Sequence, residues 1–324
     1  MTTNYSISKD SKIFIAGHRG MVGSATLDCL KAQGYQNIVT KSRKELDLTK
    51  QKDVDSFFQK EQINIVILCA AKVGGILANN TYRGDFLYDN LLISANIIKA
   101  ARDCSVGKLI NLGSSCIYPK NSDLPIKEES LLSGFLESTN EPYAIAKIAG
   151  LKLCEAFYHQ YSSNFYSIMP CNLYGERDNF DLKSSHVLPA FINKFHTAKE
   201  SDLDFVKIWG SGKPKREFLH VRDLANAILF CLENVEAEDI YKYNISHLNC
   251  GSSQEVSILE LANLIKKTVK YKGEIRFDKS KPDGTFRKVM NNNRIFKLGF
   301  LPQISLENGI QQTYNWYIKN NEKK

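Results

Sequence analysis

Short apolar runs alternate with helical patterns along the first half of the chain. The spacing predicts strands at 12–16, 37–40, 63–71, 106–112 and 165–169, and helices at 21–33, 51–60, 80–103 and 141–161. The run at 63–71 is apolar at consecutive positions, as in a strand covered on both faces. This alternation predicts a parallel sheet with helices on both sides. The expected fold class is therefore α/β, with a Rossmann-type doubly wound parallel sheet.

The pattern loosens after about residue 170. Glycine and proline become frequent, as at 210–214 (GSGKP) and 281–284 (KPDG), and further helices are predicted at 188–199, 223–233, 258–270 and 306–319. We expect a sheet domain over 1–170 and a smaller C-terminal α/β region over 171–324, partly interleaved with the sheet.

Charge narrows the class of ligand. The chain has 324 residues, 43 Lys+Arg and 35 Asp+Glu, which gives a formal charge of +8. An excess of this size suits nucleic acid, an acidic membrane surface or an acidic small molecule, but the basic residues form no block. The longest apolar run, 65–71, is far shorter than the ~20 residues of a membrane span. The spread of charge and the short runs favour the small molecule, with no nucleic acid and no membrane as partner.

Cysteine usage and the N-terminus indicate the compartment. The eight cysteines are scattered without a CxxC pair, and residues 1–11 are polar and lack the apolar core of a signal peptide. We therefore expect a reduced, cytoplasmic protein without a metal site.

A glycine motif follows the first predicted strand and opens the first predicted helix. Gly17, Gly20 and Gly23 spell GxxGxxG, which allows a tight turn and close approach of a pyrophosphate to the helix N-terminus. An ordinary glycine-rich turn is the alternative. After the second strand, 39–43 (VTKSR) lacks the acid that binds the ribose of NAD and instead carries Lys41 and Arg43. NADP(H) is therefore preferred, with Arg19 a further candidate for its 2′-phosphate.

A second pattern carries acid–base chemistry. Tyr143 and Lys147 are four residues apart and share one face of the predicted helix at 141–161, where a lysine would stabilise a phenolate. Ser114 follows the fourth strand, at the end of a sheet where ligands bind.

These three features together resemble the extended short-chain dehydrogenase/reductases. Longer strings resemble, more specifically, the GDP-L-fucose synthase family, from about residue 12 to 316: IAGHRGMVGSA, AAKVGGILANNTY, LGSSCIYP, TNEPYAIAKIAG, NLYGERDNF, WGSGKPKREFLHV and KPDGT. The resemblance implies an NADPH-dependent enzyme that epimerises GDP-4-keto-6-deoxy-D-mannose at C3 and C5 and reduces it at C4. It implies that Tyr143 protonates the C4 oxygen, that Lys147 lowers the tyrosine pKa and holds the nicotinamide ribose, and that Ser114 binds the ketone oxygen.

Two further residues match the epimerisation acid and base of that family. Cys116 and His186 stand in the strings SSCIYP and SHV, and a thiol and an imidazole can each exchange a proton near neutral pH. By spacing alone, a packed cysteine and a helix-capping or solvated histidine are the favoured interpretations; the strings reverse that preference.

The resemblance also implies two binding sets and an assembly. The cofactor set is Gly17, His18, Arg19, Gly20, Met21, Val22, Gly23, Arg43, Leu112, Lys147, Pro170, Asn172, Leu173 and His186. The GDP-sugar set is Ser115, Asn172, Lys194, Trp209, Arg216 and Lys288. Cys171 and Lys194 depart from the family's commoner residues, Trp209 could equally pack in a core, and Asp283 and His220 are expected to be structural. The family is usually homodimeric, through helices that include 81–103 and 141–161.

Two other functions compete with this interpretation. One is C4 reduction of another GDP-4-keto sugar, such as a heptose, with little or no epimerase activity. The other is a non-catalytic nucleotide sensor, which the retained Tyr143 and Lys147 disfavour.

Overall fold

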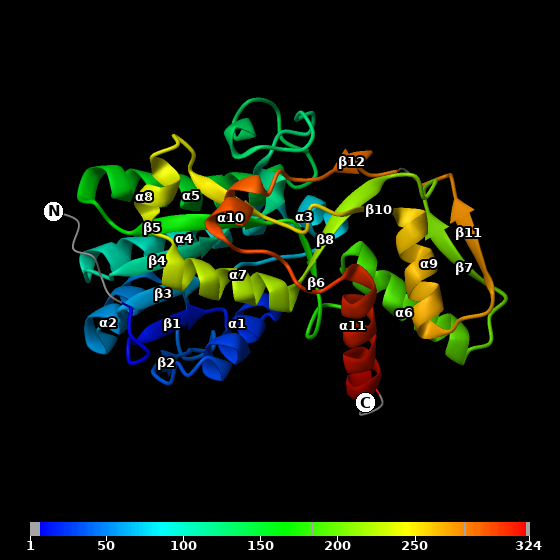
Figure 1. The fold of residues 1–324 in the computed structure, drawn as a ribbon, viewed down its shortest axis with the longest axis horizontal. Helices are drawn as coiled ribbons and strands as arrows, with labels where there is room; N and C mark the ends of the chain where they lie inside the picture. The colour runs from blue at the N-terminus through cyan, green and yellow to red at the C-terminus, as the bar shows by residue number, and fades with distance from the viewer. Residues whose placement is uncertain (1–6, 183, 282, 322–324) are drawn as a thin grey trace.

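A six-stranded sheet forms the centre of the larger part of the molecule (Figure 1). The computed structural model describes residues 7–182, 184–281 and 283–321. All pairs in the sheet are parallel, in the order β2-β1-β3-β4-β5-β9. Its strands are β1 (Ile13–Ala16), β2 (Ile38–Val39), β3 (Ile65–Leu68), β4 (Lys108–Leu112), β5 (Phe165–Pro170) and β9 (His247–Cys250). The chain adds strands on opposite sides of β1, which opens a crevice at the carboxyl ends. The predicted doubly wound α/β class is confirmed.

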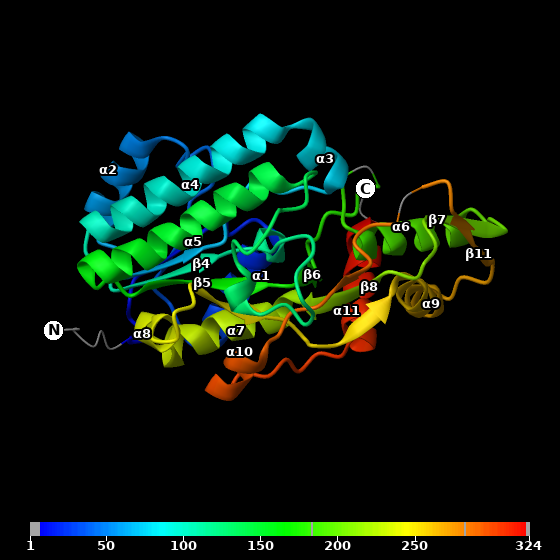
Figure 2. The ribbon, with the colours of Figure 1, turned by 90° about the horizontal axis from the view of Figure 1, so that it is seen from above.

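Helices cover both faces of this sheet, as the apolar runs predicted. Along β1, Ile13 and Ile15 belong to one buried core, and Phe14 and Ala16 to the other. Figure 2 shows helices along opposite faces of the sheet. One face carries α2 (Gln51–Glu61), α4 (Arg83–Asp103) and α5 (Glu141–Tyr161), and the other carries α1 (Met21–Ala32), α7 (Val221–Asn234) and α8 (Ala237–Tyr241).

Most predicted helices are present, but the single helix at 80–103 was wrong. Residues there belong to two helices, α3 (Ile76–Thr81) and α4. The backbone of Tyr82, at φ −108° and ψ 44°, is not helical and separates them. The strand predicted at 63–71 is also shorter, because only Ile65–Leu68 pair with β1 and β4.

The smaller region is built around β8 (Lys215–His220). This strand pairs with β6 (Asn172–Tyr174), β10 (Glu255–Ser257) and β12 (Arg287–Lys288). A second sheet joins β7 (Phe205–Trp209) to β11 (Glu274–Asp278). A separate core lies among α6 (Val187–Glu200), α9 (Ile258–Val269) and α11 (Leu306–Asn321). The chain returns to the large sheet through α7, α8 and β9, before α10 (Asn293–Leu298).

Candidate active site

The glycine turn brings backbone very close to backbone at the end of β1. Gly17 has φ +87°, and a Cβ there would lie 2.7 Å from the Ala70 backbone. A Cβ at Gly23 would lie 2.3 Å from the Gly17 carbonyl oxygen. The first turn of α1 carries no acidic side chain, so its free N–H groups face no competing charge. The turn therefore has the shape and polarity that a pyrophosphate requires.

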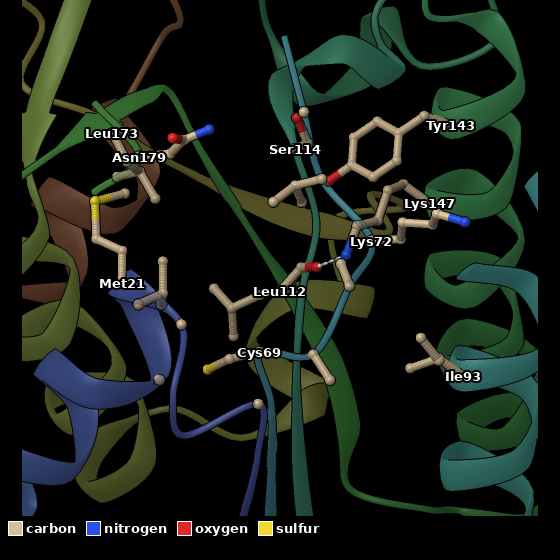
Figure 3. Close-up of a pocket in the computed structure, with 18 of the residues that line it drawn as sticks. Met21, Cys69, Lys72, Ile93, Leu112, Ser114, Tyr143, Lys147, Leu173 and Asn179 are labelled. Carbon is tan, nitrogen blue, oxygen red and sulfur yellow. Dashed lines mark hydrogen bonds between the residues drawn. The ribbon is translucent and has the colours of Figure 1, made fainter. Parts of the chain in front are cut away.

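A cleft of about 640 Å³ lies beside this turn, at the carboxyl ends of the sheet strands (Figure 3). Most of the predicted cofactor and catalytic residues line it. These are Gly17, Gly20, Met21, Val22, Gly23, Arg43, Leu112, Ser114, Ser115, Tyr143, Lys147, Pro170, Asn172, Leu173 and His186. The remaining predicted residues lie outside this lining: His18, Arg19, Cys116, Lys194, Trp209, Arg216 and Lys288.

One end of the cleft carries unpaired cations. Lys41 and Arg43 both line it, and neither makes an ion pair or hydrogen bond with another described residue. Arg19 is exposed on the glycine turn. Sequence reasoning missed the next lining segment, Leu46 to Thr49 (LDLT), in which Thr49 donates to the Asp47 carboxylate. This end suits a phosphorylated ribose and its base.

Tyr143 and Lys147 project from α5 into the cleft (Figure 3). The Lys147 ammonium lies 5.8 Å from the Tyr143 ring centroid, and burial lowers its pKa to about 8. Burial raises the pKa of Tyr143, while a hydrogen bond with Ser114 opposes that change. The nearby Cys116 thiol adds to the rise, so no net lowering of the tyrosine pKa is found. Tyr143 is held as a neutral phenol, the form that donates a proton.

Cys116 lies behind the serine pair, in the short 3₁₀-helix η1 (Ser115–Ile117). Its backbone N–H donates to the Ser114 hydroxyl at 3.5 Å. Burial raises the pKa of the thiol, and the charges of Lys288 and Lys147 oppose that rise. The thiol is thus within electrostatic reach of both the Lys147 side and the β12 side of the site.

His186 lies on a different wall of the cleft, at the N-cap of α6. The residue thus occupies the predicted N-cap position, but its side chain makes no capping hydrogen bond. Although the residue is exposed to the open cleft, the protein around its ring lowers its pKa by desolvation. The imidazole is therefore neutral near pH 7 and can accept a proton.

A second cluster of cations lies on the smaller region. Arg216 of β8 and Lys288 of β12 are Cα partners in a parallel pairing. Lys288 has no hydrogen-bond acceptor or carboxylate partner among the described residues, and Arg216 donates only to the Lys215 carbonyl. Burial lowers the pKa of both groups, and Arg216 adds to the lowering at Lys288. Two cations held side by side, neither in an ion pair with a described carboxylate, suit a polyanionic ligand.

Trp209 ends β7 and does not pack in a core, since 65% of it is exposed. The ammonium groups of Lys194 and Lys281 lie 5.8 and 5.7 Å from its ring. Asp283 accepts hydrogen bonds from the Ser211 N–H and hydroxyl, both at 2.7 Å, so the KPDG and WGSG motifs meet. His220 is buried, and its Nδ1 accepts from the Arg222 N–H at the start of α7, as a structural residue would.

Sequence reasoning also missed the loop between β6 and α6. Arg177, Asp178 and Asn179 line the cleft. Burial raises the pKa of Asp178 to about 7, and the hydrogen bond from the Asn179 N–H opposes that rise. The DNF letters of the motif were the available signal, but only the fold places them on the cleft wall.

The sequence is similar to those of known proteins over nearly its whole length. Residues 13–246 match the NAD dependent epimerase/dehydratase family. The chain is 52% identical to GDP-L-fucose synthase 1 of Arabidopsis thaliana over 312 residues, which cover 96% of this chain and 94% of the relative. It is 50% identical to the GDP-L-fucose synthase of Escherichia coli K12 over 316 residues, which cover 96% and 98%. The chain is a member of the GDP-L-fucose synthase family.

One structurally similar protein has a different activity. The GDP-mannoheptose C4 reductase of Campylobacter jejuni, with NADP bound, superposes with a TM-score of 0.90 at 38% identity. The match covers 97% of this chain and all of that one. Among the described residues, no helix is long and apolar enough to cross a membrane, and no cluster of His, Cys, Asp or Glu has the make-up of a metal site.

Proposed function

We propose that this protein converts GDP-4-keto-6-deoxy-D-mannose to GDP-L-fucose with NADPH, by epimerisation at C3 and C5 and reduction at C4. The observation that carries the proposal is the convergence of Ser114, Tyr143, Lys147 and His186 on one cleft, with Cys116 directly behind. Family membership, at about half identity to GDP-L-fucose synthases, supports the same substrate.

The cofactor fits the residues present. The glycine turn would hold the pyrophosphate, and Lys41 and Arg43 would hold the 2′-phosphate. His18, Arg19, Leu112, Pro170, Asn172 and Leu173 complete the proposed cofactor set. When bound, NADPH supplies the hydride that reduces C4. Lys147 would hold the nicotinamide ribose, Tyr143 would donate the proton to the C4 oxygen, and Ser114 would hydrogen-bond that oxygen.

Epimerisation would use Cys116 and His186. The 4-ketone acidifies the protons at C3 and C5, and inversion of each centre needs one group on each face of the ring. Cys116 and His186 approach from different elements, η1 and α6. Hydrogen bonding of the Ser114 hydroxyl to the ketone oxygen would stabilise the enolate that forms.

The GDP group would bind on the smaller region. Arg216, Lys288 and Lys194 offer positive charge to the diphosphate, and the exposed ring of Trp209 offers a surface for the base. Ser115 and Asn172 line the cleft and would contact the sugar part of the same ligand. The formal charge of +8 is then explained in part by two anionic ligands.

We also propose a cytoplasmic homodimer. Helices α4 and α5 lie side by side on the outer face of the sheet (Figure 2) and expose Tyr88, Ile145 and Tyr161. Light scattering on the purified protein tests the dimer; a monomeric mass at micromolar concentration contradicts it. All eight cysteines are free, as a reducing compartment requires.

The alternative function is C4 reduction of a GDP-4-keto heptose, which the structural likeness to a C4 reductase supports. Turnover of each candidate GDP-4-keto sugar with NADPH in deuterated water separates the two. Deuterium at C3 and C5 of the product is expected for the epimerase/reductase. Normal NADPH oxidation without deuterium at either carbon contradicts epimerisation and leaves a simple reductase.

A further inference from the structure

A strap of chain, residues 283–292, runs beside β8 and carries Lys288. Its regular pairing is short, because β12 contains only Arg287 and Lys288, opposite Lys215 and Arg216. One further backbone bond precedes it, from the Lys215 N–H to the Phe286 carbonyl at 2.9 Å. Lys288 and Arg216 are like charges in direct register, which disfavours the pairing. Beyond Lys288, the strap also meets Ile126, whose N–H donates to the Val289 carbonyl at 2.9 Å and whose carbonyl accepts from the Asn291 N–H at 2.8 Å. These bonds hold the strap on its side away from β8.

The carboxylate of Glu217 attaches the same segment to β8 itself. Its Oε2 accepts from the Met290 N–H at 2.9 Å, two residues beyond Lys288. Its Oε1 accepts from the Ser253 N–H at 2.7 Å and from the Asn292 side-chain amide at 2.8 Å. Glu217 directly follows Arg216 on β8. Its bonds to the strap therefore hold Lys288 beside Arg216.

Glu217 is enclosed by the protein. The residue is 1% exposed, and it makes no ion pair with any described cation. A Cβ at Gly251 would lie 2.2 Å from its Oε1, so the loop after β9 closes over it. Its three partners are all donors, so the site requires two acceptor oxygens. A glutamine would place an amide N–H group against one of those donors.

Glu217 also contacts Asn172, another residue of the proposed GDP-sugar set. The Asn172 side-chain amide donates to the Glu217 backbone carbonyl at 2.8 Å, across the β6–β8 pairing. The proposed substrate groups Arg216, Lys288 and Asn172 thus converge on one buried residue that touches no ligand itself.

We propose that Glu217 is a positioning residue that holds Lys288 opposite Arg216, so that both cations reach one diphosphate. The inference rests on the proposed function. It accounts for a buried carboxylate without a counter-ion, because the negative charge holds the Met290 N–H and the Asn292 amide of the strap rather than neutralising the two protein cations.

The test compares Glu217→Gln with Lys108→Met, using GDP and NADPH as calorimetric probes of the full-length protein. Lys108 is buried at the start of β4, whereas the cleft lies at the other end of that strand. Its replacement should therefore lower stability without altering any contact of the strap. We expect both variants to melt earlier. Only Glu217→Gln should weaken GDP binding, by about 10- to 50-fold, as for a charged hydrogen-bond network partly broken. NADPH affinity should stay within about twofold, and the GDP-sugar KM should rise with kcat nearly unchanged.

Each other result decides against the inference. Unchanged GDP affinity in folded Glu217→Gln, or equal weakening in Lys108→Met, overturns it while leaving the proposed function standing. A wild-type protein that binds no GDP overturns the proposed function and this inference with it. Should Glu217→Gln fail to fold, Asn292→Ala removes one donor to the same carboxylate; about 3- to 10-fold weaker GDP binding is expected, and no change overturns the proposal.

Discussion

The Lys147 ammonium donates a 2.8 Å hydrogen bond to the carbonyl oxygen of Leu112, the last residue of β4. This bond ties α5 to the carboxyl end of the sheet and fixes the amine beside the Tyr143 ring (Figure 3). Because the lysine is 5% exposed, its burial lowers the pKa to about 8. The amine is therefore oriented for a ligand before any ligand binds.

Replacing Tyr143 by phenylalanine should remove the proton donor while keeping the ring contact with Phe86, whose centroid lies 6.4 Å away. We expect kcat for ketone reduction to fall by about 10²- to 10⁴-fold, and NADPH affinity to change by less than about threefold. Stopped-flow NADPH oxidation and fluorescence titration measure the two quantities. Tyr161→Phe, at the far end of α5, is the matched control; unchanged turnover in Tyr143→Phe removes that residue from its role.

Replacing Cys116 by serine should stop epimerisation and spare reduction. A serine hydroxyl has a far higher pKa than a thiol and exchanges protons poorly at neutral pH. Mass spectrometry should show no deuterium uptake from deuterated water into the 4-keto sugar, while a pre-epimerised substrate is still reduced. Cys104→Ser, remote from the cleft, should behave as wild type. Normal exchange in Cys116→Ser would show that the thiol is only packed there.

Replacing Arg43 by alanine should weaken NADPH binding more than NADH binding. Arg43 lines the cleft without a protein partner, so its charge is available to the 2′-phosphate. Loss of a charged hydrogen bond is worth about 1.5–3 kcal/mol, or roughly 10- to 100-fold in Kd for NADPH. Fluorescence titration of both dinucleotides measures the ratio. Neighbouring Lys44, exposed and outside the lining, gives the control Lys44→Ala; equal losses for both dinucleotides would contradict the assignment.

Acid should destabilise the fold through His247. Burial lowers the pKa of this histidine from 6.5 to about 3, so the unfolded chain binds one more proton between those values. Stability is therefore lost as pH falls below 6.5, by about 2 kcal/mol at pH 5. Urea unfolding measures the free energy of unfolding at pH 7.5 and pH 5. The difference between the two pH values should be about 2 kcal/mol smaller in His247→Gln than in wild type. The exposed His159→Gln should keep the wild-type dependence; a His247→Gln variant that also kept it would contradict the assignment.

Replacing Lys108 by methionine should cost about 2–4 kcal/mol of unfolding free energy. Its buried ammonium donates to the carbonyls of Leu232 and Val235 at 2.9 Å, and to the Glu236 carboxylate at 2.8 Å. Methionine fills the space but removes the donor to the Leu232 carbonyl, whereas the Val235 carbonyl still accepts from the Tyr166 hydroxyl at 3.1 Å. Urea denaturation followed by circular dichroism measures the loss. The exposed i,i+4 pair of Lys99 with Asp103 provides the control Lys99→Met, for which about 0.5 kcal/mol or less is expected.

The sequence determined the features whose physics is local. The glycine turn, the i,i+4 placement of Tyr143 and Lys147, and the helices of the second half follow from contacts within one strand, turn or helix. The large parallel sheet also follows, because its strands are apolar on both faces and separated by helices. The break at Tyr82 was missed, since no proline marks it and the nearby Gly84 lies inside α4.

The tertiary structure alone decided what depends on distant segments. The two-residue strand β12 is too short to show a period, so no pattern could place Lys288 in register with Arg216, 72 residues earlier. Exposure of Trp209, the approach of Lys288 to Cys116 and the burial that raises rather than lowers the Tyr143 pKa depend on how the smaller region packs against the sheet. Desolvation and register are properties of the packed chain, and a linear pattern contains neither.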